Sequence, residues 1–372
     1  MYANLNGKRI GLYKPLGIGD GLFGLIVSSL LKKKIPDSTI IYLGIDYPET
    51  LLKNHHSIDH YYVLPRGKKP SSELRVKLQA LNLDIIIFAY SNRYFMKLAK
   101  ELKIPVRVGF GDKIYTYLYC NHWTSFWTTK KTFKYHHNIH NDLLLYKKFD
   151  RMLEIDSKKI IEAISYKSEV DENKDFSLSK DKFKLIIHPG GATGKSRTWS
   201  AKHYRQLINL LDVDKFQVIL TGGPQEMALC DAIKSQRKDI LNFSGKLSLE
   251  ELKALILQAD GLIAASTGPL HLSAFLGKHT LGIFPSFGAE SAIKWGPVGK
   301  KALAVALHKK CTRAICKQAM PLCHCIASIP VIDIKEIMET WEKGENIEQL
   351  ISSTSSKLNF WYAPNDLMKH FK

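Results

Sequence analysis

The chain has 372 residues, of which 45% are hydrophobic, and its 54 basic and 35 acidic residues give a formal net charge of +19. This composition excludes a largely disordered chain, and the length predicts two domains of ordinary size. The basic excess favours an anionic partner, such as a phosphate-rich substrate, an anionic membrane surface or nucleic acid. Because it falls into short clusters at residues 32–34, 66–69 and 130–131, without a nucleic-acid-binding motif, a solvated basic surface is an equal alternative.

The apolar runs of the chain are short. The first eight residues lack the apolar core of a signal peptide, and residues 22–31 form a run too short and too broken to cross a bilayer. We therefore expect a cytoplasmic protein.

The first half of the sequence alternates short apolar runs with amphipathic ones. Strands are expected at residues 9–13, 39–45, 84–90 and 106–110, and helices at residues 22–33, 71–81, 92–102 and 138–153. This alternation predicts a parallel sheet with helices on both faces. Residues 115–135 interrupt it with aromatic side chains interleaved with lysines, which suits an acceptor groove or a membrane interface. An inward-packed irregular segment is the alternative.

A polar, charged segment at residues 165–182 is typical of a linker, and a second alternating series follows it. Its strands are expected at residues 183–188, 216–221, 240–243, 261–265 and 280–284, with helices starting near residues 200, 224, 248 and 269. Ser248 and Glu251 fit a capping box. The sequence thus predicts an α/β fold with two Rossmann-like, doubly wound domains facing a central cleft: residues 1–164, the linker 165–182, residues 183–345, and a tail, 346–372, that packs back on the first domain.

The turn at residues 266–271 follows a buried strand and opens a helix. Backbone N–H groups and the positive end of the helix dipole at such a start suit a diphosphate. Pro269 fits the first helical position, and His271 can donate to a phosphate. An ordinary strand–turn–helix junction with a packed histidine explains the segment equally well.

Two further turns follow strands in the second series. In residues 188–199, glycines let the backbone approach an anion, and Lys195 and Arg197 can neutralise phosphate charge. The segment is not a P-loop, because only three residues separate Gly190 from Gly194, and a flexible basic loop is the alternative. In residues 221–226, Glu226 can accept hydrogen bonds from a ribose or sugar hydroxyl, or it can stabilise a helix start.

In the first domain, Asp20 follows the first strand. A carboxylate there can remove the proton of an acceptor hydroxyl, although it can also be the N-cap of the next helix. An overlapping Gly-x-Gly-x-x-Gly pattern at residues 19–24, with Asp46 after the next strand, suggests dinucleotide binding and an oxidoreductase. That match is weak, because five residues separate Tyr13 from Gly19.

Four of the six cysteines cluster late in the chain, at Cys311, Cys316, Cys323 and Cys325. Their thiolates, with His324, can hold a structural zinc or iron. The Cys-x2-Cys pairs of common zinc sites are absent, so reduced thiols are the alternative.

Taken together, the motifs resemble glycosyltransferase family 9, the lipopolysaccharide heptosyltransferases. The resemblance covers most of the chain and is strongest from residue 188 to residue 286. It is carried by Gly19-Asp20 and by the motifs at residues 188–191, 221–226, 244–249 and 267–271, followed by Ala274 and Gly277.

The resemblance implies a GT-B fold and metal-independent, inverting transfer of heptose from ADP-L-glycero-D-manno-heptose, with no cofactor required for catalysis. It places Asp20 at the general base. It implies that the donor is bound by Thr193, Lys195, Arg197, Glu226, Leu247, Ser266, Thr267, Gly268 and His271.

The resemblance also implies the partners: a nucleotide-diphosphate sugar, the anionic Kdo/lipid A inner core of lipopolysaccharide as acceptor, and the inner leaflet of the cytoplasmic membrane, where the protein would be peripheral. The family commonly has Asp where this chain has Ser266, which leaves the donor sugar open. The alternatives are a GT-B enzyme that uses another nucleotide sugar and a non-catalytic lipopolysaccharide-assembly protein of the same fold.

Overall fold

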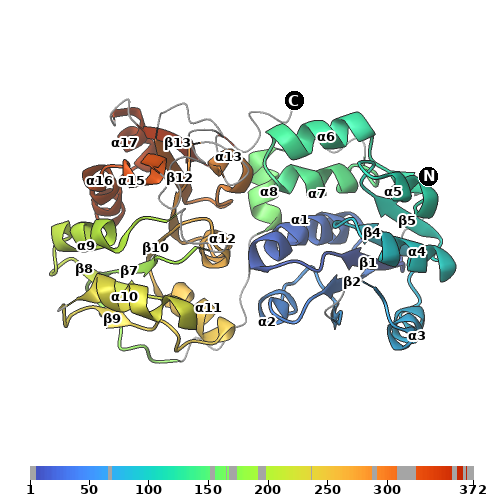
Figure 1. The fold of residues 1–372 in the computed structure, drawn as a ribbon, viewed down its shortest axis with the longest axis horizontal. Helices are drawn as coiled ribbons and strands as arrows, with labels where there is room; N and C mark the ends of the chain where they lie inside the picture. Colours follow the sequence, from blue (N-terminus) through green and yellow to red (C-terminus); the bar gives the residue numbers. More distant parts are fainter. Residues whose placement is uncertain are drawn as a thin grey trace. The chain divides into compact units, whose positions relative to one another are not determined.

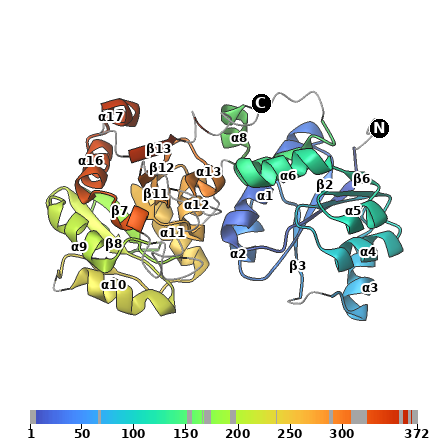
Figure 2. The same ribbon diagram turned by 45° about the horizontal axis from the view of Figure 1, so that its top comes forward.

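A computed structural model describes residues 6–65, 69–150, 156–164, 166, 174–191, 198–235, 237–286, 291–307, 324–353, 358–362 and 366, with backbone alone at 132–135, 352 and 353. The chain divides into two compact units, whose boundary falls between Glu169 and Val170, within the segment predicted as a linker. Each unit is described by itself (Figures 1 and 2).

The first unit is a six-stranded parallel sheet with the strand order β3-β2-β1-β4-β5-β6. Its strands are β1 (Arg9–Tyr13), β2 (Thr39–Gly44), β3 (His60–Val63), β4 (Ile85–Phe88), β5 (Val106–Gly109) and β6 (His122–Trp123). Its helices are α1 (Ile18–Lys34), α2 (Glu49–Leu52), α3 (Ser72–Ala80), α4 (Arg93–Glu101), α5 (Ile114–Tyr119), α6 (Phe126–Tyr135), α7 (Ile139–Tyr146) and α8 (Ser157–Ala163).

Successive side chains of a strand point to opposite faces of the sheet, so the residues of β2 show which helices cover each face of the first unit. On β2, Ile41 and Leu43 join the apolar core that α3 and α4 cover, whereas Tyr42 points to the opposite face. There the Tyr42 hydroxyl donates to the Gly21 carbonyl of α1 at 3.2 Å. Helix α1 packs on this face together with α7 and α8. Both faces of the sheet are thus covered, as the predicted parallel sheet requires.

The second unit is a seven-stranded sheet with the order β13-β12-β11-β10-β7-β8-β9, parallel except for β13 at one edge. Its strands are β7 (Phe183–His188), β8 (Phe216–Leu220), β9 (Leu241–Asn242), β10 (Gly261–Ala264), β11 (His279–Ile283), β12 (Ala302–Leu307) and β13 (Leu358–Tyr362). Its helices are α9 (Ala201–Leu210), η1 (Pro224–Glu226), α10 (Met227–Lys234), α11 (Leu249–Gln258), α12 (Gly268–Phe275), α13 (Ala292–Trp295), α15 (His324–Ala327), α16 (Val331–Glu342) and α17 (Ile347–Ser353).

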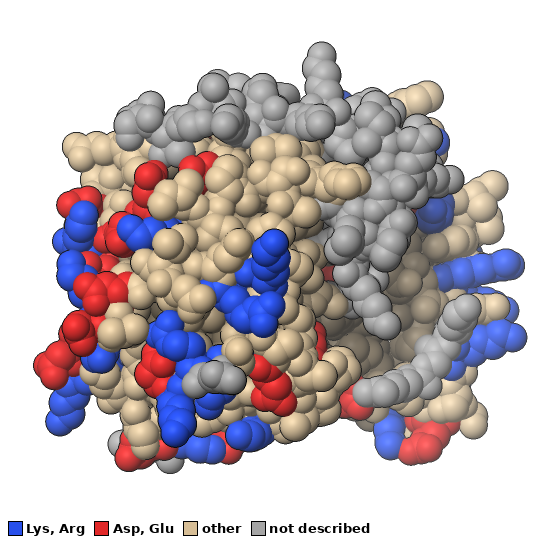
Figure 3. Space-filling model, turned by 60° about the vertical axis from the view of Figure 1, so that its left-hand side comes forward, with Lys and Arg blue, Asp and Glu red and all other residues tan. Residues whose placement is uncertain are grey.

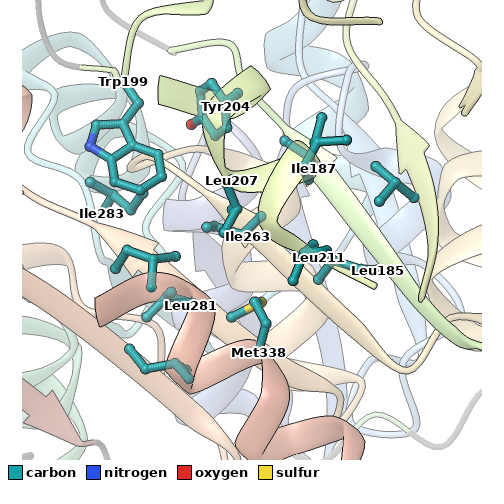
Figure 4. Close-up of a cluster of buried hydrophobic side chains, with 14 of the residues drawn as sticks. Leu185, Ile187, Trp199, Tyr204, Leu207, Leu211, Ile263, Leu281, Ile283 and Met338 are labelled. Carbon is teal, nitrogen blue, oxygen red and sulfur yellow. The ribbon is translucent and has the colours of Figure 1, made fainter. Parts of the chain in front are cut away.

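Figure 4 shows the main core of the second unit, in which side chains of β7, β10 and β11 meet those of α9 and α16. Trp199 is 1% exposed, and its indole N–H donates to the Ile326 carbonyl at 3.1 Å, so the polar end of this large ring is satisfied. The capping box of α11 is confirmed: the Ser248 hydroxyl accepts from the Glu251 N–H at 3.2 Å, and the Glu251 carboxylate accepts from the Ser248 N–H at 2.7 Å.

The predicted α/β fold class with two Rossmann-like sheets is confirmed, and the differences concern short or late elements. The sequence interpretation missed β3, β6, β12 and β13. Residues 115–135, which interrupt the predicted alternation, contain α5, β6 and α6.

The C-terminal tail and the linker segment also differ in part from their predicted structure. The tail was expected to pack on the first domain, but its residues 358–362 form β13, which pairs with β12 in the second sheet. Residues 367–372 of the tail lie outside the described residues. In the segment predicted as a linker, Phe176 is buried, and its ring lies 5.8 Å from that of Phe243 in the second unit.

Within the described part of the chain, no helix has the length and hydropathy that a membrane span requires. On the face of the second unit turned forward in Figure 3, Lys and Arg side chains are interspersed with Asp and Glu side chains among the described residues. In the first unit, Lys32 pairs with Asp59 at 2.8 Å and Lys34 with Asp150 at 2.5 Å. Part of the basic excess is therefore neutralised locally.

Candidate functional site

Both sheets share one topological feature that locates candidate ligand sites. In the first, the chain passes from β1 to β2 on one side and later adds β4 on the other; in the second, β7 has β8 on one side and β10 on the other. Ligands of such sheets bind beyond the carboxyl ends of the strands where the order reverses. The candidate ligand sites therefore follow β1 and β4 in one unit and β7 and β10 in the other.

Three turns of the second unit lie at one edge of its sheet. The register pairs Ala264 of β10 with His188 of β7, and Ile187 of β7 with Leu220 of β8. Because the three strands are parallel and adjacent, the segments that follow them, 189–191, 221–226 and 265–268, emerge side by side. The structure thus brings together three segments that the sequence marked separately as suited to an anion or sugar.

Thr267 is the N-cap of α12, which begins at Gly268, so Pro269 is the second helical residue rather than the predicted first. Thr267 is 5% exposed, and its hydroxyl has no hydrogen-bond partner among the described residues. A buried hydroxyl without a partner costs free energy of folding, about 1–3 kcal/mol. Together with the first N–H groups of α12, which have no partner within the helix itself, it forms a donor set that a bound anion would complete.

Two buried histidines flank this helix start. His271 is 2% exposed in the first turn of α12, and His188, 7% exposed, ends β7 with its Nδ1 3.0 Å from the Thr221 hydroxyl oxygen. Burial lowers the pKa of each imidazole to about 4. Both rings are therefore neutral at pH 7, so His271 offers a phosphate a hydrogen bond rather than a positive charge.

Glu226 lies in η1, after β8, where its carboxylate accepts a hydrogen bond from the Gly223 N–H at 2.5 Å. A side chain at Gly190 would overlap this carboxylate, so the glycine after β7 leaves the space that Glu226 occupies. This close approach connects two of the predicted motifs. The half-buried carboxylate is held by one backbone N–H and retains acceptor capacity for a hydroxyl group.

Leu247 and Ser266 are both half-buried. Leu247 belongs to the turn between β9 and α11, in which Gly245 takes a φ of +69° and donates from its N–H to the Gly222 carbonyl at 2.8 Å. A left-handed φ favours glycine. The turn that carries Leu247 is thus tied to the turn that carries Glu226, at the same edge of the sheet.

In the first unit, α1 begins four residues earlier than predicted, with Gly17 as its N-cap. Asp20 is therefore the third residue of the helix and not its cap. Its carboxylate is half-buried, lies in the first turn near the positive end of the helix dipole, and makes no side-chain hydrogen bond within the described part of the chain. Burial raises the pKa of Asp20, and the charge of Lys14 opposes that rise.

Lys14 follows β1 directly, and its ammonium group forms an ion pair with Asp142 of α7, 128 residues away in the sequence. Lys14 is 4% exposed and Asp142 1%. Burial raises the pKa of Asp142 to about 6, Lys14 opposes this rise, and the charge of Asp20 adds to it. Two carboxylates and one ammonium group thus interact at the carboxyl end of β1.

The glycines of the Gly-x-Gly-x-x-Gly pattern have a packing explanation. A Cβ at Gly21 would come within 2.8 Å of Leu52, and one at Gly24 within 3.0 Å of both Lys14 and the Tyr42 hydroxyl. These glycines lie inside α1 and let it approach the sheet over the Lys14 side chain. The pattern therefore positions the ion pair and does not form the turn that the dinucleotide motif requires.

Several predicted residues cannot be placed: Thr193, Lys195, Arg197, Cys311, Cys316 and Cys323 lie outside the described residues. Cys325 is buried in α15. The described residues contain no group of three or more His, Cys, Asp or Glu side chains that could hold a metal ion. Because three of the four clustered cysteines are not among them, the metal site stays a prediction.

Sequence reasoning missed Lys14 and Asp142. The available signals were a lysine directly after a buried strand and a single acid in the helix Ile139–Tyr146, where it is buried. Neither pattern identifies the other residue, because their pairing depends on the fold.

Two Rossmann-type sheets, one with a carboxylate after its first strand and one with an anion-suited helix start, are features of the GT-B class of glycosyltransferases. Residues 72–323 match the sequence profile of glycosyltransferase family 9 (heptosyltransferase), which is more than half of the chain. The chain belongs to this family, and it is a glycosyltransferase of the heptosyltransferase type.

Among curated relatives, a putative glycosyltransferase of Haemophilus influenzae is 26% identical over 300 residues, which cover 76% of this chain and 83% of the relative. Lipopolysaccharide heptosyltransferase 1 of Campylobacter coli is 25% identical over 295 residues, covering 74% of this chain and 83% of the relative.

Among solved structures, ADP-heptose lps heptosyltransferase II of E. coli superimposes with a TM-score of 0.72 at 16% identity, covering 90% of this chain and 99% of that one. E. coli heptosyltransferase WaaC with ADP gives a TM-score of 0.65 at 16% identity, with the same coverage. These likenesses support the fold alone.

Proposed function

We propose that the protein transfers heptose from ADP-L-glycero-D-manno-heptose to the Kdo/lipid A inner core of lipopolysaccharide, with inversion at the anomeric carbon. The observation that carries the donor half of this proposal is Thr267: a buried hydroxyl without a partner, at a helix start beside the ends of β7 and β10. Membership of the heptosyltransferase family, and relatives whose names specify lipopolysaccharide and ADP-heptose, support the choice of substrates.

The proposed reaction is a single displacement. Asp20 takes the proton of the acceptor hydroxyl as its oxygen attacks the anomeric carbon, and the bond from that carbon to the diphosphate oxygen breaks on the opposite side. The diphosphate leaves with the electron pair, and the configuration inverts. The raised pKa of Asp20 supports this role, because a base with a pKa nearer neutrality accepts a proton more readily.

The donor diphosphate binds, on this proposal, to the α12 helix start through Thr267, Gly268 and the neutral His271. Lys195 and Arg197 supply the positive charge that Thr267, Gly268 and the neutral His271 lack. Thr193, Glu226 and Leu247 contact the nucleoside or the sugar, and Glu226 accepts from a hydroxyl group. Because N–H donors and basic side chains meet the diphosphate charge, we expect transfer to persist in EDTA, with no metal or cofactor required for catalysis.

A second candidate, transfer of a different nucleotide sugar, is favoured by Ser266. This serine replaces the aspartate that the family commonly has, and a hydroxyl offers a sugar one hydrogen bond without charge. The two candidates share the fold, the base and the diphosphate site, and they differ in the donor.

A nucleotide panel followed by a transfer assay tests the donor. We expect ADP to raise the melting temperature more than UDP, GDP or NAD, and ADP-heptose to glycosylate Kdo-lipid A. Stabilisation by UDP but not by ADP would remove heptose as the donor and leave the second candidate. Stabilisation by NAD alone, or no transfer with any donor, would contradict the proposed reaction.

The proposed acceptor is an anionic glycolipid, so we also propose that the enzyme is peripheral on the inner face of the cytoplasmic membrane. The net charge of +19 supports attraction to that anionic surface.

A further inference from the structure

The first unit exposes an unusual group of large apolar side chains within a short stretch of sequence. Ile114 is 80% exposed and Trp127 77%, and Tyr117, Leu118 and Trp123 between them are also exposed. These five side chains are here called the apolar surface; they belong to α5, β6 and α6, whose ribbons are labelled in Figure 2. Single exposed apolar residues are common, but a group of them marks an interaction surface.

Four members of the apolar surface are neighbours, and the fifth, Trp127, lies on α6, the next helix of the chain. Ile114, Tyr117 and Leu118 are spaced three and four residues apart, which places them on one side of α5, while Thr116 is buried on the other. The Tyr117 ring packs edge-on against the Trp123 ring, with centroids 5.1 Å apart. Trp127 follows in the first turn of α6, edge-on to Phe126 at 5.2 Å.

The backbone beneath the apolar surface is firmly held. The Thr124 hydroxyl accepts from the Gly111 N–H at 3.0 Å and shares a hydrogen bond with the Thr129 hydroxyl at 2.5 Å. The Tyr117 hydroxyl donates to the Gly111 carbonyl at 2.7 Å. These bonds join α5, the turn before α6 and α6 itself. The side chains are therefore presented outward by a fixed scaffold.

The segment that carries the apolar surface has a basic excess, with one acid at its start: the largely buried carboxylate of Asp112 lies 3.4 Å from the Lys113 ammonium. From residue 113 to residue 141 the sequence contains four lysines and no aspartate or glutamate. Lys113, Lys130 and Lys131 are exposed, and the Lys130 ammonium lies 4.6 Å from the centroid of the Phe126 ring. A protein partner with a matching apolar surface would not need this excess, whereas an anionic surface would attract it.

We propose that the apolar surface and its lysines dock on a bilayer of anionic phospholipids. Trp and Tyr rings favour the level of the lipid headgroups, Ile114 and Leu118 reach the acyl boundary, and the lysines meet the headgroup phosphates. This inference deepens the proposed function, because a lipid-linked acceptor lies in a membrane. It also gives the proposed membrane association a specific surface.

Flotation with vesicles tests the docking without donor or acceptor, so its outcome is independent of the proposed reaction. Vesicles of phosphatidylglycerol and phosphatidylethanolamine are compared with vesicles of phosphatidylcholine alone, at low and physiological salt. We expect the wild type to bind the anionic vesicles and to bind more weakly as salt increases. No binding to anionic vesicles, or equal binding to both kinds, would overturn the proposal.

Substitutions locate the surface. Ile114→Ser with Trp127→Ser should lower vesicle binding at least tenfold, and Trp127→Phe should retain most of it. Lys130→Gln and Lys131→Gln should each lower binding about fivefold. The matched controls are Val76→Ser, at a 67% exposed position of α3, and Lys202→Gln on α9; both should bind as the wild type does. Unchanged binding by the double serine variant would show that the apolar surface does not dock.

Two measurements separate the other possible occupants. If the apolar surface were instead an acceptor groove, the double serine variant would lose transfer to a lipid-free acceptor, which we expect it to retain. If a second copy of the chain covered it, light scattering would show a dimer that the double serine variant disrupts; we expect the same mass for both. Because all five side chains are exposed, we expect the variants to have the same melting temperature as the wild type.

Discussion

The two sheets have the same order of parallel strands, but their equivalent ends hold different chemistry. After β1 of the first unit lie charged groups: Asp20 and the buried pair of Lys14 and Asp142. At the ends of β7 and β10 in the second unit, the described groups suited to an anion are uncharged donors, namely the Thr267 hydroxyl, the α12 N–H groups and the neutral imidazole of His271. The Glu226 carboxylate lies at the same edge and accepts from the Gly223 N–H.

This difference fits the two halves of a group transfer. A base must change its protonation, so it needs neighbouring charges that adjust its pKa. A diphosphate site must bind an anion without exchanging protons, and dipoles fixed by the fold do this with little reorganisation. On the proposed mechanism, one topology therefore serves both tasks, and the residues placed at the strand ends decide which.

The largest expected effect is that of Asp20→Asn. The amide keeps the shape of the side chain but cannot take a proton, so transfer should fall by roughly 10²- to 10⁴-fold. The affinity for ADP should not change, because the proposed nucleotide site lies in the second unit. Initial rates and calorimetry measure the two quantities, with Asp37→Asn, an exposed acid of the first unit, as control. An active asparagine variant would show that Asp20 is not the base.

Lys14→Met tests the charge balance of the first unit. Removing the cation leaves Asp142 buried without its partner, which should cost about 3–5 kcal/mol of stability. The pKa of Asp20 should rise, because Lys14 lowers it, so the pH at which the enzyme becomes active should move upward.

The variant Lys14→Met with Asp142→Leu serves as the stability control. It should recover much of the lost stability, because no buried charge remains unpaired, and it should keep the shifted pH profile of transfer. An unchanged profile in both variants would mean that Lys14 acts on folding alone.

Thr267→Val tests the uncharged site. Valine has nearly the shape of threonine, and the Thr267 hydroxyl makes no hydrogen bond in the described structure. The substitution should therefore leave the melting temperature equal or higher, while ADP binds roughly 10- to 100-fold more weakly through loss of a hydrogen bond to a charged group. Thr267→Ser should restore binding. A destabilised valine variant with normal ADP affinity would assign the hydroxyl to structure.

The smallest expected effect is the pH dependence contributed by His271. Its folded-state pKa is lowered to about 4, below the ~6.5 of an unfolded chain, so between these values only the unfolded state binds the proton. The contribution of the neutral imidazole to stability is complete above pH 6.5 and is lost as the pH falls. The loss amounts to about 2 kcal/mol at pH 5. Melting curves from pH 7 to pH 5 should fall less steeply for His271→Gln than for the wild type; parallel curves would contradict a buried neutral imidazole.

The sequence predicted the elements that depend on local pattern. Buried strands such as Gly261–Ala264, and the Leu185–Ile187 part of β7, are short apolar runs followed by turn residues. The capping box of α11 requires only Ser248 and Glu251 at the correct spacing. Strand β6, which the sequence interpretation missed, has only two residues, and β13 pairs antiparallel at an edge, so local pattern defines them poorly. The helix starts of α1 and α12 were each predicted late.

By itself, the sequence determined the α/β class, the two repeated halves and the positions of the strand-end turns, because apolar periodicity and turn chemistry act over a few residues. Only the tertiary structure decided which turns lie together, since this depends on the lateral order of strands far apart in the chain. It also decided the pairing of Lys14 with Asp142 and the burial of Thr267. Burial and charge pairing are produced by neighbours in space, and for these residues the decisive neighbours come from other segments of the chain.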